Sequence, residues 1–303
     1  MPGVTILTYH GVTDVESRGI ENFQGKHVSA ETFAHQVRYL REHERALRLS
    51  DLIDAYERGD DPDGVVVTFD DGYQNNYRVA LPILERFEVP ATFFFSTGFL
   101  GTDRMFWVDE VELAVDATGA DRLDVTGWGL GVYPLATSAE RMTAVTELKA
   151  HLKRVDDGLR ESRVAELAES LPPRPGHTPS PNYRTLTWDE VRALARSPLV
   201  EIGAHTVDHP ILTRIGGEAL RCQVGDSKKA LERETGRPVT QFAYPNGGPD
   251  DFDATVIHAV RAAGFRCGCT TLPGRNTADV SLFELRRTMV GFCGEPFPFP
   301  IGD

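Results

Sequence analysis

Two short stretches of the sequence combine residue types that bind metal ions and move protons. His205 and His209 lie four residues apart in H-T-V-D-H, a spacing that brings two imidazoles within reach of one ion. Asp70 and Asp71 are adjacent in T-F-D-D-G, so one carboxylate can bind the ion while the other stays free as a base. An ion held there would lower the pKa of a bound water towards about 7 and polarise an acyl oxygen. A leaving amine would then need a proton, for which His10 is the available acid.

Each of these signals is weak by itself, and their shared position gives them weight. Most H-x-x-x-H pairs are surface histidines, D-D-G is a common turn, and a single histidine often belongs to a core. Here all of them directly follow apolar runs that are typical of strands. The remaining histidines fall on expected helices or loops, and we predict that they are solvated: His27, His35, His43, His151, His177 and His258.

Seven apolar runs are the expected strands that must position these side chains. Several are nearly continuous in hydrophobicity and rich in β-branched or aromatic residues, as in parallel strands that are buried on both faces. The runs are 3–9, 65–69, 91–96, 199–204, 239–244, 265–271 and 284–290. Polar strand-end residues such as those above would then converge, because barrel active sites lie at the carboxyl ends of the strands.

Helical patterns separate most of these runs. Helical spacing or end signals indicate helices at 30–43, 76–87, 187–195, 216–235 and 252–263. Strands that alternate with helices imply a parallel sheet. We therefore expect an α/β fold, a distorted (β/α) barrel with about seven parallel strands.

The long gap between the third and fourth expected strands predicts an insertion. Residues 97–198 hold a helix at 107–117, a hairpin near 122–135 and helices near 139–156 and 159–170. We interpret the chain as one barrel domain over residues 1–303, with 97–198 as a helical insertion packed on it.

Composition and charge limit the classes of binding partner and the cellular compartment that we expect. The formal net charge of -13 argues against binding nucleic acid or an anionic membrane, because both would repel the chain. No apolar run reaches the roughly 18 residues of a membrane span, and the first residues do not resemble a secretory signal. We expect a cytoplasmic protein whose cysteines are thiols, with Cys267 and Cys269 buried in a strand. No pattern predicts the oligomeric state.

The same residues resemble the motifs of the polysaccharide deacetylase family, a group of carbohydrate esterases with the nodulation-type deacetylase domain. T-F-D-D-G at 68–72 is similar to the first motif of the family and implies Asp70 as base and Asp71 as metal ligand. H-T-V-D-H-P at 205–210 is similar to the second motif and implies His205 and His209 as the other ligands.

The third motif is matched only in part. F-A-Y-P-N-G at 242–247 resembles it, which implies that Tyr244, Pro245 and Asn246 line the substrate pocket and that a backbone amide near Tyr244 helps to hold the oxyanion. The arginine that orients the base in the family is absent, with Phe242 and Ala243 in its place, and Arg287 on the last expected strand is our candidate substitute. Trp107, in M-F-W-V-D, is a further candidate, for stacking on a sugar.

The last motif of the family, a C-terminal strand that ends in Leu-x-His, is also missing, since residues 284–303 contain no histidine. I-L-T-Y-H at 6–10 resembles that strand moved to the N-terminus, as in the circularly permuted members that act on poly-N-acetylglucosamine. This resemblance implies His10 as the acid that protonates the leaving amine.

The expected function is metal-dependent hydrolysis of an N-acetyl or other N-acyl group on an amino sugar or oligosaccharide. Zn²⁺ is the expected ion, while one Asp and two His also suit Co²⁺, Ni²⁺ or Fe²⁺. Two alternatives stay open. A non-haem iron oxygenase also uses two histidines and one carboxylate, and a non-catalytic glycan-binding protein could keep this fold without turnover.

Overall fold

The computed structural model describes residues 3–300, which form two compact units. The first unit takes in the residues up to 14, residues 24–103 and the residues from 185 onward. The second takes in residues 15–23 and 104–184. The interpretation as one domain with an insertion at 97–198 stays a prediction, and each unit is described here by itself.

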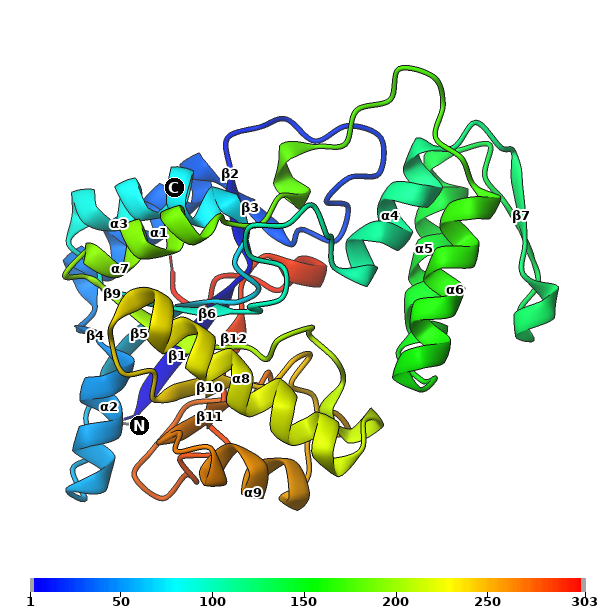
Figure 1. Ribbon diagram of the computed structural model, residues 1–303. Coiled ribbons are helices and arrows are strands. Elements are labelled where there is room, and N and C mark those ends of the chain that lie inside the picture. Colours follow the sequence, from blue (N-terminus) through cyan, green and yellow to red (C-terminus); the bar gives the residue numbers. More distant parts are fainter. Residues whose placement is uncertain (1–2, 301–303) are drawn as a thin grey trace. The chain divides into compact units, whose positions relative to one another are not determined.

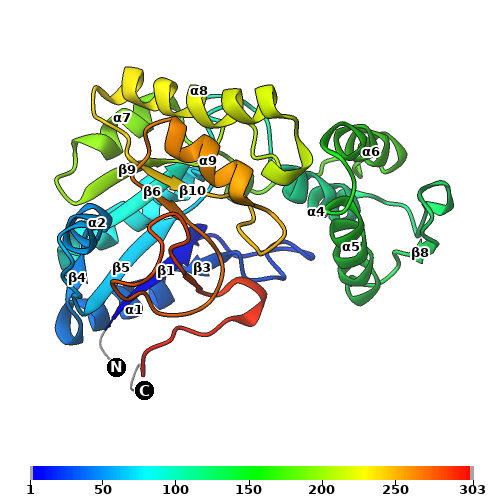
Figure 2. The ribbon, with the colours of Figure 1, turned by 90° about the horizontal axis from the view of Figure 1, so that it is seen from below.

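A parallel sheet forms the centre of the first unit (Figures 1 and 2). Seven strands follow one another in the order β11, β10, β9, β6, β5, β1, β12, every pair parallel, while the short β4 pairs with β5 beside them. This confirms the predicted fold class. The strands are β1 (Val4–Tyr9), β4 (Ala46–Leu47), β5 (Gly64–Phe69), β6 (Ala91–Phe95), β9 (Val200–Ala204), β10 (Gln241–Ala243), β11 (Cys267–Cys269) and β12 (Thr288–Met289).

The last predicted strand, 284–290, is divided between the two edges of this sheet. Leu285 makes a parallel bridge to Cys269 of β11, and Thr288 and Met289 then pair with β1. The backbone amide of Arg287 donates to Leu272 O at 3.0 Å between these two pairings. The segment therefore links the first and last strands of the row, and the side chain of Arg287 is fully buried where they meet.

Helices flank this sheet and bury their apolar faces against it. The helix α7 begins with a capping box in which Thr187 and Glu190 satisfy each other's backbone amides. The predicted helix at 76–87 starts with a π-helical turn, Asn76–Ala80, before the α-helical part. The helices are α1 (Ala30–His43), α2 (Leu49–Glu57), α3 (Leu81–Phe87), α7 (Trp188–Arg196), α8 (Gly217–Thr235) and α9 (Ala254–Ala262).

The second unit has its own apolar core. Its predicted helices and hairpin are present as α4 (Trp107–Ala117), α5 (Ser138–Leu152), α6 (Asp157–Ser170) and the antiparallel strands β7 (Arg122–Asp124) and β8 (Val132–Pro134). Residues 15–23, distant in sequence, join this unit, and Ile20 is part of its core.

Two further expectations concern cysteines and membranes. Cys267 and Cys269 are buried free thiols, as predicted. Between residues 3 and 300, no helix is both long and apolar enough to cross a bilayer.

Gly203 in β9 is predicted to tolerate no larger residue without strain, because a Cβ there would lie 2.4 Å from the ring of Phe94. Gly203→Ala should lower the free energy of unfolding by roughly 1–3 kcal/mol through overpacking, measured by urea unfolding. Gly225→Ala on α8 is the matched control, since nothing lies within 4 Å of its added Cβ. Equal stabilities of the two variants would contradict the prediction.

Candidate metal centre

The side chains singled out in the sequence leave the sheet at one edge. His10 directly follows β1, Asp70 and Asp71 follow β5, and His205 follows β9. Backbone hydrogen bonds continue the ladder into these residues, from Asp70 N to Tyr9 O at 2.9 Å and from His205 N to Phe95 O at 2.9 Å. Since the strands are parallel, their carboxyl ends bring the side chains together.

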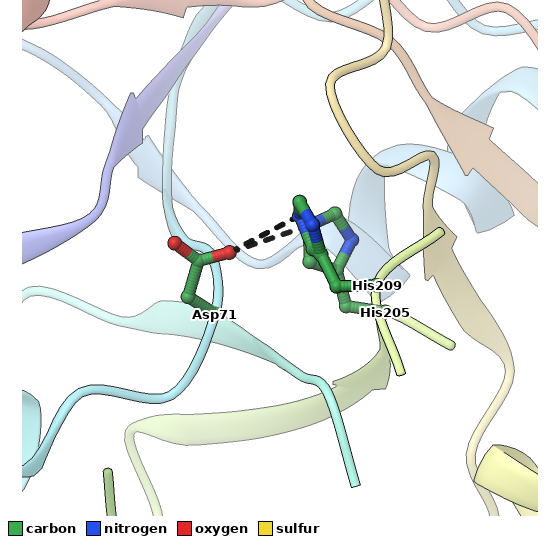
Figure 3. A group of neighbouring side chains, drawn as sticks. All are labelled: Asp71, His205 and His209. Carbon is green, nitrogen blue, oxygen red and sulfur yellow. Dashed lines mark ion pairs between the residues drawn. The ribbon is translucent and has the colours of Figure 1, made fainter. Parts of the chain in front are cut away.

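Asp71, His205 and His209 form a compact group (Figure 3). Asp71 Oδ1 lies 3.6 Å from His205 Nε2 and 3.4 Å from His209 Nε2. One ligand atom from each residue lies within 4.8 Å of the other two, so a single ion can be reached by all three. Within residues 3–300, this is the one group of three or more His, Cys, Asp or Glu side chains with that property.

Hydrogen bonding orients His205 for coordination. Its Nδ1 donates to the carbonyl oxygen of Ala243, at 2.7 Å, which leaves the lone pair on Nε2 directed at Asp71. Burial lowers the pKa of His205, although the charge of Asp70 opposes this, so the ring is kept neutral. Neutral imidazole is the form that binds metal ions.

The backbone at the ligands adopts conformations that non-glycine residues rarely take. Asp71 has φ 75°, Thr206 has φ 70° and His209 has φ 56°, all in the left-handed region. Such residues cost of order 1–3 kcal/mol each and tend to gather at functional sites. Two imidazoles and one carboxylate on this backbone fit a divalent ion with coordination positions left for water and substrate.

The carboxylate of Asp70 is held by Arg287. The guanidinium donates to both carboxylate oxygens, at 2.8 and 2.7 Å, and its Nε donates to Thr270 O at 2.7 Å. Burial raises the pKa of Asp70, but the charge and hydrogen bonds of Arg287, together with the influence of His205 and His10, outweigh it and lower the pKa to about 2. Asp70 is therefore ionised at neutral pH, and the role of Arg287 as a substitute for the missing motif arginine stays a prediction.

His10 is partly buried and lies within the electrostatic influence of Asp70, His205 and Arg287. Its Nδ1 has no hydrogen-bond partner in the described part of the chain, and its ring lies 5.4 Å from that of Phe292. Burial lowers the pKa of His10 to about 4, against the opposing charge of Asp70. His10 is thus neutral at pH 7.

A buried cluster beside His10 was missed by the sequence analysis. His27 was predicted to be solvated, and this is wrong: it is 4% exposed in the strand β3 (His27–Ser29), which pairs with β2 (Gly11–Thr13). Burial lowers its pKa well below the ordinary value. Lys26 is also buried, and its Nζ donates to the hydroxyl of Tyr73 at 2.9 Å. The sequence analysis missed this cluster because the segment is polar and a buried Lys is rare in proteins.

The third-motif residues form the turn after β10. The amide of Tyr244 donates to Cys269 O at 3.0 Å and its hydroxyl to Phe283 O at 2.9 Å, so neither is offered to a ligand. That a backbone amide near Tyr244 holds the oxyanion stays a prediction, and the amide of Tyr244 itself is occupied by Cys269 O. Asn246 has φ 60°, and its Nδ2 is buried with no partner among the described residues, which makes it the polar group of this turn that is suited to a substrate.

Trp107 lies in the second unit, at the start of α4. It packs against the core of that unit, with the guanidinium of Arg160 5.4 Å from its ring centroid. Stacking of Trp107 on a sugar stays a prediction.

Solved structures of other proteins share this fold. The Streptococcus pyogenes deacetylase PplD in complex with acetate superposes with a TM-score of 0.62 and 19% identity, covering 97% of this chain and 94% of that one. IcaB from Ammonifex degensii superposes with a TM-score of 0.62 and 20% identity, covering 96% and 92%. At these identities the likeness concerns the fold alone.

Sequence comparison identifies the family. A Staphylococcus aureus (strain MSSA476) poly-β-1,6-N-acetyl-D-glucosamine N-deacetylase is 31% identical over 97 residues, which are 31% of this chain and 32% of the relative. YxkH of Bacillus subtilis (strain 168) is 27% identical over 114 residues, 37% of this chain and 39% of the relative. The aligned stretches thus span well under half of either relative. The family model for polysaccharide deacetylase matches residues 57–268, more than half of the chain and including Asp70, Asp71, His205 and His209. The chain belongs to the polysaccharide deacetylase family.

Proposed function

We propose that this protein is a metal-dependent deacetylase that removes the N-acetyl group from an amino sugar in a glycan. The observation that carries the proposal is the buried group of Asp71, His205 and His209 beside an ionised Asp70. The substrate class is supported by the Staphylococcus aureus relative, whose name specifies an N-acetyl-D-glucosamine polymer. Zn²⁺ is the ion we propose, and the donor set also suits Co²⁺, Ni²⁺ or Fe²⁺.

Asp70 is the proposed base. A divalent ion held by the three ligands supplies Lewis acidity, which makes water acidic and polarises the acyl oxygen. Asp70 accepts the proton of the attacking water, and Arg287 keeps its carboxylate ionised and fixed in direction by two hydrogen bonds. Asn246 Nδ2 is the proposed donor to an oxygen of the substrate, because a buried, unpaired donor costs about 1–3 kcal/mol until a ligand satisfies it.

His10 is the proposed acid for the leaving nitrogen. A neutral imidazole has no proton to give at its accepting nitrogen, so His10 must first be protonated during the reaction. The negative charge of Asp70 raises the pKa of His10, whereas Lys26 and Arg287 lower it. The proton that Asp70 takes from the water passes to His10, which delivers it to the leaving nitrogen as the C–N bond breaks. Acetic acid and the free amine form, the acetic acid gives its remaining proton to the solvent, and the enzyme gains no proton.

The decisive test compares Asp70→Asn with wild type on N-acetylated glucosamine oligomers, with acetate release as the readout. Wild type should release acetate, and Asp70→Asn should lose at least 10²-fold in turnover while keeping one bound ion, because the base is lost and the ligands remain. His205→Ala is the matched control and should lose the ion as well as the activity.

Other outcomes identify the alternatives. Metal binding without acetate release from any N-acetylated sugar would favour the non-catalytic glycan-binding protein. Oxygen consumption with bound iron and no acetate would favour the oxygenase.

Removal of Arg287 is predicted to shift the pH–rate profile. Without the guanidinium, burial raises the pKa of Asp70 against the weaker opposing influence of His205 and His10 only. In Arg287→Ala the acidic limb of kcat/KM should therefore move to higher pH, whereas Arg287→Lys, which keeps the charge, should move it less. An unchanged limb in Arg287→Ala would remove this residue from the site.

The same change should also destabilise the fold by about 3–5 kcal/mol, because it leaves a buried carboxylate unpaired. The double variant Arg287→Met/Asp70→Asn removes both charges and should regain most of that free energy of unfolding without regaining turnover. This variant separates loss of fold from loss of catalysis.

Acid should destabilise the metal-free protein before its carboxylates titrate. The pKa of His10 falls from 6.5 to about 4 on folding, so the unfolded chain binds more protons between those values. The contribution of His10 is complete above pH 6.5 and is lost as the pH falls towards 4, which amounts to about 2 kcal/mol by pH 4.5. His27 and His205 act in the same direction.

Urea unfolding at pH 7 and pH 4.5 measures this effect. His10→Gln should show a smaller loss of stability between the two pH values than wild type, and His35→Gln, at an exposed position of α1, serves as the control. An identical pH dependence in His10→Gln would show that His10 is not buried in its neutral form.

A further inference from the structure

The loop that carries both histidine ligands is strained. It runs from His205 to His209 after β9, and Thr206 and His209 within it have φ values of 70° and 56°. Neither residue is a glycine, so the surroundings must offset a cost of order 1–3 kcal/mol for each. The position of His209 Nε2 therefore depends on the contacts that hold this loop.

One side of the loop is held by the segment after β6. Thr97 N donates to Thr206 O at 3.1 Å and Gly98 N donates to Val207 O at 2.8 Å. The approach is close, since a Cβ on Gly98 would lie 2.7 Å from Asp208 Oδ1. Thr206 Oγ1 also accepts from the amide of His209, at 3.0 Å.

The other side is held by one side chain of α8. Gln223 Oε1 accepts from the backbone amides of Val207 and Asp208, at 3.0 and 2.8 Å. Gln223 Nε2 donates to Asp208 Oδ2 at 2.8 Å. The oxygen and the nitrogen of the Gln223 amide are thus both hydrogen-bonded to Val207 and Asp208, the two residues between Thr206 and His209.

This pattern requires both a donor and an acceptor in one planar group. The backbone amides need an acceptor, and the carboxylate of Asp208 needs a donor. A glutamate at position 223 would keep the acceptor but would lack the donor and would face Asp208 with a like charge. An aliphatic residue would leave two N–H groups and a carboxylate without this partner.

We infer that Gln223 is the positioning residue of the metal centre: it holds the strained turn so that His209 is set for the ion before the ion binds. The inference rests on the metal site of the proposed function. Replacing a residue that orients metal ligands from outside the coordination shell typically lowers metal affinity by 10–100-fold. If Gln223 preorganises the turn, its replacement should lower the affinity for the metal ion in addition to any effect on folding.

The test titrates metal-free protein with Zn²⁺ against a competing chelator. Gln223→Ala should raise the Kd for Zn²⁺ by about 10–100-fold, and Gln223→Glu should raise it too, because the donor to Asp208 is lost. Adding Asp208→Asn to Gln223→Glu exchanges donor and acceptor and should restore the Kd to within a few-fold of wild type. Arg221→Ala, an exposed change two residues earlier on α8, is the control and should leave the Kd unchanged.

The outcomes separate this inference from the proposed function. A wild-type Kd in Gln223→Ala and Gln223→Glu, with a lowered melting temperature of the metal-free protein, would reduce Gln223 to a structural role and overturn the inference alone. Failure of wild type to bind Zn²⁺ or another divalent ion would overturn the metal centre itself. If Gln223→Ala does not fold, the Gln223→Glu variant and its rescue by Asp208→Asn, which hardly change volume, decide the question.

Discussion

The ion pair between Arg287 and Asp70 joins two parts of the sheet. Arg287 lies in the segment that contacts both β11 and β1, and Asp70 is the proposed base after β5. Arg287 is 1% exposed and Asp70 is 3% exposed, so both charges are removed from water at a large desolvation cost. Two hydrogen bonds to the carboxylate and one to Thr270 offset that cost. The pair therefore forms only when residues 285–289 lie between β11 and β1, which is the arrangement that completes the row of strands.

The fold and the grouping of Asp71, His205 and His209 were accessible from sequence because both follow from local patterns. Strands buried on both faces read as apolar runs, and parallel pairing places the residues after β5 and β9 at one edge. That rule is sufficient to join Asp71 with His205 and His209 without knowing any other contact. It does not depend on the helices or on the second unit.

Features set by non-local packing were not predictable in the same way. His27 lies in a polar stretch, and its neighbours in the fold are distant in sequence: β3 pairs with β2, and the ring of His27 packs against Tyr73. Residues 15–23 have no apolar periodicity that indicates the core of α4 and α5 as their partner. Arg287 was named from the sequence, but its contact with Asp70 depends on alternation along residues 284–290, which sends Arg287 inward while Arg286 is exposed. Gln223 carried no signal, since an isolated glutamine on a helix is ordinarily a surface residue.

The charge state of His10 follows from the same constraint that fixes Asp70. Arg287 keeps Asp70 ionised, and a negative Asp70 favours the imidazolium of His10, yet the cations Arg287 and Lys26 and the burial of the ring oppose it. A charged Asp70 favours protonation of His10, so the two groups are electrostatically coupled. In the mechanism proposed above, Asp70 recovers its charge when it passes the proton of the water to His10, and His10 then gives that same proton to the amine.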